Sequence, residues 1–98
     1  MGYWVSQEVN SKVDGTKIHI FDIPNGYVTA RAGVAILRCS GWGGWVECGI
    51  QVNGMIVSRR ASSGNWGSTV NAYVPAGVTL NIMTGGDGGL EYFKFMEF

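Results

Sequence analysis

Apolar and polar residues alternate along much of this chain with a period of two. The clearest example is residues 69–74, where valine and alanine occupy the even positions and threonine, asparagine and tyrosine the odd ones. The pattern resumes at 78–82, after Pro75, Ala76 and Gly77. Alternation of this kind predicts half-buried β-strands, and Pro and Gly favour a tight turn between them. We therefore expect two strands that meet at this proline–glycine turn.

A second turn is predicted at Asn53-Gly54, because both residues tolerate the positive φ angles of a type I′ turn. Strands are expected on either side of it, near 45–52 and 55–60. Further strand candidates, rich in β-branched and aromatic residues, are 17–23, 27–38 and 90–98. No window shows a convincing 3.6-residue period, so helix should be almost absent. These patterns predict an all-β fold: a single, jelly-roll-like β-sandwich of antiparallel strands joined by short glycine-rich turns.

The amino-terminal stretch, residues 1–15, is open to two interpretations. Its apolar residues Tyr3, Trp4, Val5 and Val9 suit either a first strand or a packed arm. Residues 16–98 are expected to form the sandwich, and no linker, charge run or internal repeat divides the chain. A domain of this length buries only roughly two-thirds of its unfolded surface, so its core should be thin.

Composition narrows the range of partners. Hydrophobic residues make up 46% of the chain and charged residues 14%, against about 25% charged residues in typical domains. We therefore expect part of the apolar surface to meet a partner.

Seven basic and seven acidic residues cancel, which removes the attraction that dominates binding to nucleic acid and to anionic membranes. No apolar run approaches the roughly 18 residues of a membrane span, and the first residues lack a signal-peptide pattern. Neither nucleic-acid binding nor membrane insertion is expected.

The two cysteines flank the turn-like stretch Ser40–Gly44. If this stretch closes a hairpin that pairs Cys39 with Trp45, Cys48 falls opposite Ile36 and points to the other face. We therefore interpret both cysteines as reduced, small apolar residues rather than as a disulfide. They fit a protein made in a reducing cytoplasm.

Residues suited to catalysis are sparse. His19, the single histidine, shares a face with Lys17 and Phe21, and no nucleophile motif accompanies it, so a structural or interfacial role is favoured over a general base. The carboxylates form no recognisable acid–base pair by spacing, and two cysteines with one distant histidine do not supply a metal site. The stretch Gly85–Gly89 lacks the lysine and the strand-to-helix context of a phosphate loop. We expect no enzyme activity, cofactor or metal.

Two tryptophans lie in glycine-rich turns, where small neighbours leave a large ring partly uncovered. Trp42 lies within Ser40–Gly44, and Trp66 follows a small polar stretch that ends at Asn65. An exposed indole offers a flat apolar face and an N–H donor, which suit a sugar ring or a protein partner. We predict receptor contact through both rings, with Asn65 and Asp87 as polar neighbours. The alternative is that these rings cover the small core or lie in a subunit interface.

The last strand is apolar on both faces. Phe93 and Phe95 share one face, while Tyr92, Met96 and Phe98 share the other. Such a strand is either central in a two-layer core or buried against another chain. We predict a homotrimer whose interface is lined by one of these two sets, while the other set faces the protomer core. A core this small is best stabilised by closing a three-fold interface.

Three short segments carry a family resemblance: Val52–Val57 with a V-N-G turn, the serine-, glycine- and asparagine-containing stretch Ala61–Asn65, and Val70–Leu80 with a V-P-A-G turn. In this order, followed by an aromatic strand that ends the chain, they resemble the carboxy-terminal domains of bacteriophage tail fibres, tail spikes and tail-needle knobs. The tryptophan content and the two cysteines depart from the commoner pattern. The resemblance implies a homotrimeric jelly roll, shaped like tumour necrosis factor or C1q, at the distal end of a virion fibre.

The resemblance and the apolar last strand both indicate a protein that assembles and binds. The expected function is a non-enzymatic, homotrimeric receptor-binding domain of the virion tail, made in the host cytoplasm and directed at a glycan or protein on the host surface. The first alternative is a purely structural virion assembly or decoration domain, with the same interface but no receptor. A monomeric carbohydrate-binding module is the second alternative, and an enzyme comes last.

Overall fold

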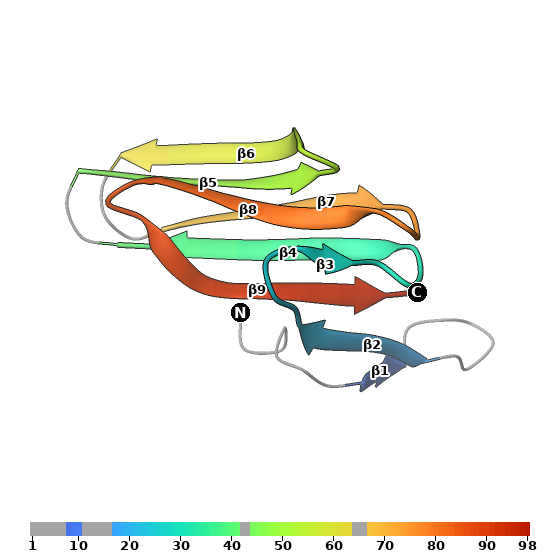
Figure 1. Cartoon of the computed structure of the whole chain (residues 1–98). Helices are drawn as coiled ribbons and strands as arrows, with labels where there is room; N and C mark the ends of the chain where they lie inside the picture. The colour runs from blue at the N-terminus through green and yellow to red at the C-terminus, as the bar shows by residue number, and fades with distance from the viewer. Residues whose placement is uncertain (1–7, 11–16, 42–43, 64–66) are drawn as a thin grey trace.

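Nine strands make up the regular secondary structure of the computed structural model, which describes residues 8–10, 17–41, 44–63 and 67–98. They are β1 Glu8–Asn10, β2 Lys17–Asp22, β3 Tyr27–Val28, β4 Gly33–Ser40, β5 Trp45–Val52, β6 Met55–Ser63, β7 Ser68–Val74, β8 Thr79–Gly86 and β9 Gly89–Glu97. Two antiparallel sheets pack as a sandwich (Figure 1). Sheet A has the order β1-β2-β9-β4-β7, and sheet B the order β3-β8-β5-β6. The all-β prediction is confirmed.

From β2 onward the chain moves back and forth between the sheets, and the β5–β6 hairpin is the one step that stays within a sheet. Each sheet therefore pairs strands that are far apart in sequence, such as β2 with β9 and β5 with β8. Eight strands interleaved in this way form a jelly roll, and β1 extends sheet A at its edge. The predicted jelly-roll-like sandwich is confirmed, and three of the first fifteen residues belong to it as β1.

The β5–β6 hairpin forms at the predicted turn. Asn53 and Gly54 have φ angles of 51° and 85°, as a type I′ turn requires. The expected strand at 27–38 is instead divided into β3 and β4. The division arises because the chain crosses from sheet B to sheet A between Val28 and Gly33.

Thr29 holds this crossing in place. The residue is buried, and its backbone nitrogen donates to the Val78 carbonyl over 2.9 Å while its own carbonyl accepts from Gly77 over 2.8 Å. Its hydroxyl donates to the Pro75 carbonyl over 2.8 Å and accepts from the Val78 nitrogen over 3.1 Å. These hydrogen bonds tie the β3–β4 connection to the proline–glycine turn between β7 and β8.

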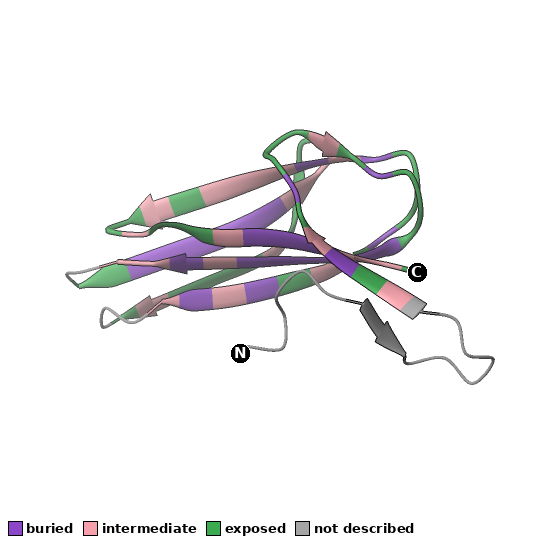
Figure 2. Cartoon of the chain, turned by 90° about the horizontal axis from the view of Figure 1, so that it is seen from below, coloured by how far each residue is buried: buried purple, intermediate pink, exposed green. Residues whose placement is uncertain are grey.

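The core lies between the two sheets. Alternate residues of the inner strands point into it, and Figure 2 shows the buried residues along the middle of the strands with exposed residues at the turns. The inward residues of β4 and β5 are Ala35, Leu37, Cys39, Val46, Cys48 and Ile50. Phe93 and Phe95 of β9 also face this core, and the Phe95 ring packs edge-on against Phe21 at 6.0 Å between ring centres.

The outer face of sheet A carries a second set of buried side chains. Ile20, Val34 and Ile36 are buried although the alternation of their strands places them on the side away from the core. Lys94 lies on the same face, and its largely buried side chain forms an ion pair with the exposed Asp22 on the neighbouring strand β2. A buried charge requires such a partner to offset the loss of its hydration.

The predicted hairpin that pairs Cys39 with Trp45 is wrong. Strand β4 lies in sheet A and β5 in sheet B, so the two strands do not pair with each other. Cys48 does not point away from Cys39 either, because both side chains face the core, where both are free and fully buried. The turn residues show that the chain reverses, but they do not show whether the next strand stays in the same sheet.

Candidate binding surface at the loop end of the sandwich

Three chain connections meet at one end of the sandwich, which we call the loop end. They are the β4–β5 connection, residues 41–44, the β6–β7 connection, residues 64–67, and the β8–β9 turn, residues 87–88. Strand register brings them together, since Ser40 pairs with Gly89 and Trp45 pairs with Ser63. Figure 1 shows the β8–β9 turn on the left of the molecule, opposite the carboxy terminus, with the end of β4 and the start of β5 beside it.

The four predicted receptor-contact residues all belong to these connections. Trp42 is part of the first, Asn65 and Trp66 of the second, and Asp87 of the third. Trp42, Asn65 and Trp66 lie outside the described residues, whereas Asp87 is described and exposed. Of the four, only Asp87 can therefore be placed at the loop end by the structure, and the placement of the other three stays a prediction.

Asp87 joins the β8–β9 turn to the β4–β5 connection. Its carboxylate oxygen Oδ2 accepts a hydrogen bond from the Gly44 nitrogen over 3.2 Å, and its backbone nitrogen donates to the Trp45 carbonyl over 2.8 Å. On the other side of the same connection, a Cβ atom at Gly41 would lie 2.0 Å from the Asp87 carbonyl oxygen. Only glycine fits against the turn at this point, so the two connections pack directly on each other.

Gly67 anchors the third connection to the end of β4. Its φ angle of 131° is in the region that favours glycine, and a Cβ atom there would lie 2.7 Å from the Cys39 carbonyl oxygen. Nearby, the hydroxyls of Ser62 and Ser68 are 2.9 Å apart, and the Ser62 hydroxyl also donates to the Gly67 carbonyl over 3.3 Å. The base of the β6–β7 connection is therefore fixed from both sheets.

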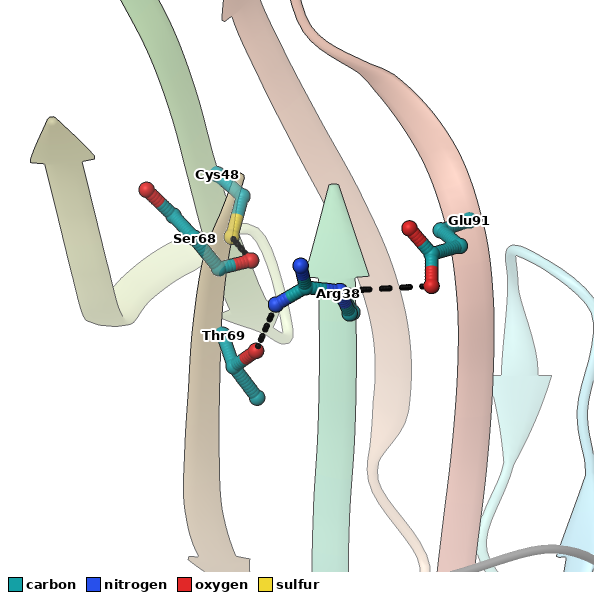
Figure 3. Close-up of polar contacts among 5 residues, drawn as sticks. All are labelled: Arg38, Cys48, Ser68, Thr69 and Glu91. Atoms are coloured by element: carbon teal, nitrogen blue, oxygen red, sulfur yellow. Dashed lines mark hydrogen bonds and ion pairs between the residues drawn. The ribbon is translucent and has the colours of Figure 1, made fainter. Parts of the chain in front are cut away.

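Arg38 joins three strands of sheet A directly below the loop end (Figure 3). From β4, its Nε atom donates to Oε2 of Glu91 on β9 over 3.2 Å, and its Nη1 atom donates to the Thr69 hydroxyl on β7 over 3.0 Å. A planar guanidinium group can hold two partners in fixed directions. This contact stiffens the part of the sheet from which the connections emerge.

Two apolar side chains that the sequence analysis did not single out are exposed at this end. Trp45 and Leu90 are 44% and 54% exposed. Val46 faces the core, so alternation along β5 places the Trp45 indole on the outer side of sheet B. The alternation of β5 was the signal that could have identified Trp45, because the inward set Val46, Cys48 and Ile50 leaves Trp45 on the other face.

Glu91 is paired with Arg38, and no three His, Cys, Asp or Glu side chains gather as metal ligands anywhere in the described ranges. His19 lies at the opposite end, because it pairs with Glu97 at the far end of β9, and its exposed ring is 5.4 Å from that of Phe21. Within the described residues there is also no helix long and apolar enough to cross a membrane.

The two faces of the last strand have different surroundings. Phe93 and Phe95 are buried in the protomer's own core, while Tyr92 and Met96 lie on the outer face of sheet A and are partly exposed. Phe98 is 38% exposed, with its ring 6.1 Å from that of Tyr73, which is 81% exposed. Of the two sets predicted for the oligomer interface, the set Tyr92, Met96 and Phe98 therefore has surface to offer a second chain.

No protein family model matches the chain, and no curated protein matches it. Among solved structures, it is similar to a novel beta-glucosidase from Paenibacillus barengoltzii, with 10% sequence identity and a TM-score of 0.48. The match covers 92% of this chain and 10% of that chain, so this chain spans about a tenth of the length of the beta-glucosidase. At this identity and TM-score the likeness carries no argument about function.

Proposed function

We propose that this chain is the host-receptor-binding domain at the tip of a bacteriophage tail fibre or tail-needle knob, and that it acts as a homotrimer without catalysis. The observation that carries the proposal is the described part of the loop end, where the exposed Trp45, Leu90 and Asp87 lie at strand ends that the register brings together. We propose that Trp42, Asn65 and Trp66, which belong to the same connections by sequence, add to this surface. Connections on a fixed sandwich can change in sequence without refolding the domain. A receptor-binding surface that must follow changes in its host is well served by this arrangement.

The scaffold below the loops supports recognition because it is held in place before a ligand arrives. The hydrogen bond from Gly44 to Asp87 and the contacts of Arg38 with Glu91 and Thr69 fix the bases of the connections. Ordering groups on binding reduces affinity, so a described contact residue that is already held in place, such as Asp87, loses less.

The chemistry of the described loop end favours a neutral, partly apolar ligand. Trp45 and Leu90 offer apolar contact area, and the exposed carboxylate of Asp87 can accept hydrogen bonds from hydroxyl groups at its rim. A sugar ring or a small protein patch has the same mixture of apolar faces and hydroxyl or amide groups. The chain's zero net charge supports neither nucleic acid nor an anionic membrane as the ligand.

The trimer is proposed to form through the outer face of sheet A. There Tyr73, Met96 and Phe98 expose apolar surface around Val34, which pairs in register with both Tyr73 and Met96. Apolar surface concentrated at the centre of a patch is typical of homo-oligomer interfaces. This face lies on the side of sheet A away from the core, and the loop end lies at the ends of the strands, so assembly leaves the loops available.

Light scattering of the purified chain at micromolar concentration, followed by a glycan array and a whole-cell binding screen, tests the proposal. We expect a mass three times that of the chain and binding to at least one glycan or cell surface. A monomeric mass contradicts the homotrimer. A trimer that binds no cell surface points instead to a structural virion domain, and a monomer that binds a glycan points to a carbohydrate-binding module.

A further inference from the structure

Cys39 and Cys48 face each other across the core of the sandwich. Cys39 is on β4, an inner strand of sheet A, and Cys48 is on β5, an inner strand of sheet B. Both side chains are 0% exposed and belong to the same core cluster. The Cys48 thiol lies 3.3 Å from the carbonyl oxygen of Ser68, and Ser68 on β7 pairs in register with Cys39, so the two cysteine side chains lie close together in the core. Each sheet therefore contributes one cysteine to this pair, and a bond between the two would join the sheets covalently.

The surroundings of the two thiols differ. The Cys48 thiol donates to the Ser68 carbonyl over 3.3 Å (Figure 3). Burial raises the pKa of Cys48, and hydrogen bonds from Cys39 together with the charges of Arg38 and Arg60 offset part of that rise. Burial, and then the neighbouring Cys48, raise the pKa of Cys39 to about 12. Of the two thiols, Cys48 is the one whose anionic form is favoured by nearby arginine charges.

We propose that Cys39 and Cys48 are the site of a reversible disulfide that joins the two sheets when the protein meets a low-molecular-weight disulfide such as oxidised glutathione. The Cys48 thiolate attacks one sulfur of the oxidant and releases one glutathione thiolate. The Cys39 sulfur then attacks the Cys48 sulfur of the mixed disulfide and releases the second. The two cysteine protons end on the two released thiolates, and the oxidant takes up the two electrons.

The proposed disulfide would lie at the base of the β4–β5 connection of the loop end. Eight residues, Ser40–Glu47, separate the two cysteines, and they include the whole β4–β5 connection with Trp42. A disulfide would close this segment into a small covalent ring at its base. The reduced and the oxidised chain would thus differ in whether this segment is closed by a covalent bond. The chemistry of the pair does not depend on what the loop end binds, so the two proposals can fail separately.

The test compares disulfide formation in the folded and unfolded chain. The protein is equilibrated with defined mixtures of reduced and oxidised glutathione, once in buffer and once in urea, then quenched with acid and its thiols counted by mass spectrometry. A bond that stabilises the fold must form more readily in the folded protein, and a ring of this size predicts an equilibrium constant about tenfold or more above that in urea. Starting the buffer samples from unfolded protein as well as from folded protein ensures that the buried thiols meet the oxidant.

We expect the oxidised folded protein to be two daltons lighter, to have no free thiol, and to melt about 10 °C higher than the reduced protein. A dithiol should reverse both changes. The single variants Cys39→Ala and Cys48→Ala are the matched controls and should show no such mass loss or melting shift. An equilibrium constant in buffer equal to or below that in urea overturns the proposal, as does a product that is only a glutathione adduct or a cross-linked dimer.

Discussion

The carboxylate of Asp87 accepts a hydrogen bond from the backbone nitrogen of Gly44 over 3.2 Å, and so links two connections that are 43 residues apart in the chain. Nothing in the local sequence around either residue indicates this contact. It arises because β4 and β9 are neighbours in sheet A while β5 and β8 are neighbours in sheet B. The contact makes Asp87 part of the loop scaffold as well as a predicted ligand contact.

Replacing Asp87 with Ala should free the Gly44 amide without unfolding the domain. Because the residue is exposed, the melting temperature should stay within about 3 °C of that of the parent. Hydrogen exchange of the Gly44 amide, followed by NMR, should become about tenfold faster, as expected for loss of a weak exposed hydrogen bond. The variant Asp87→Asn keeps an acceptor oxygen and serves as the control. Unchanged exchange at Gly44 in the alanine variant would show that the contact does not hold the connection.

Thr29 offers a test of the fold itself. Thr29→Val keeps the shape of the side chain but removes the hydroxyl that donates to Pro75 and accepts from Val78. The buried Val78 nitrogen then loses a partner, so we expect the free energy of unfolding to fall by about 1–3 kcal/mol. Urea unfolding measures the loss. Thr79→Val, at a threonine whose strand position points outward beside Val28, is the control and should change stability far less. Equal effects of the two variants would contradict this role.

Local sequence patterns predicted the strands well because they report on the chain a few residues at a time. Asn53-Gly54 requires no distant contact to form its turn, and β5 begins and ends where the pattern placed it. The alternation near Tyr73 likewise predicted an exposed ring next to a buried Val74. Each of these features depends on local backbone preference and on which face of the strand is exposed to solvent.

The same patterns do not specify which strands pair with each other, and the candidate site depends on strand pairing. The glycine-rich stretch 40–44 indicated a reversal, but whether the next strand joins the same sheet is decided by packing across the core, so the geometry of the cysteines was predicted wrongly. The contact between Gly44 and Asp87 at the loop end likewise follows from pairings such as β4–β9 and β5–β8. Such pairings are long-range, and one sequence does not reveal them.

The outer face of sheet A can be tested at Phe98. If this ring lies in a homotrimer interface, Phe98→Ala should cost on the order of 3 kcal/mol per chain, and three times that per trimer. We expect light scattering to show dissociation at micromolar concentration while the circular dichroism spectrum keeps its β signature. Phe95→Ala is the contrasting variant, because that ring is in the protomer core and its loss should unfold the chain. A Phe98→Ala protein that remains trimeric would place the interface elsewhere.

Alkaline pH should destabilise the fold through Cys39. Its pKa is raised from 9.0 to about 12 by burial and by Cys48, so above pH 9 the unfolded chain releases a proton that the folded chain keeps. The contribution of the Cys39 thiol to the free energy of unfolding is fully present below pH 9 and is lost as the pH rises toward 12. The free energy of unfolding should fall by at most about 1.4 kcal/mol per pH unit in this range. Urea unfolding at a series of pH values, with a reductant present, measures the slope. Cys39→Ser should reduce it, and parallel slopes for the two proteins would contradict the assignment.

Substituting Trp42 and Trp66 distinguishes a role of these residues in receptor recognition from a role in structural support. Loops tolerate sequence change on a fixed sandwich, and rigid aromatic rings supply contact area at small entropic cost. Each well-stacked indole could therefore contribute roughly 1–3 kcal/mol to receptor binding, with Asn65 and Asp87 as hydrogen-bonding neighbours. The double variant Trp42→Ala, Trp66→Ala should then lose binding to host cells while its melting temperature and its trimer mass stay unchanged.

The competing interpretation makes the opposite prediction for the same double variant. If Trp42 and Trp66 cover the core or lie in the subunit interface, their removal exposes apolar surface that was buried, and this should lower the melting temperature or dissociate the trimer. Trp45→Ala is an informative companion, because that ring is described, lies at the same end and is 44% exposed. A large drop in melting temperature for the double variant, with little change for Trp45→Ala, would mean that Trp42 and Trp66 are structural and that the receptor surface must be sought elsewhere. Lost cell binding with unchanged melting for the double variant would instead assign recognition to the loop end.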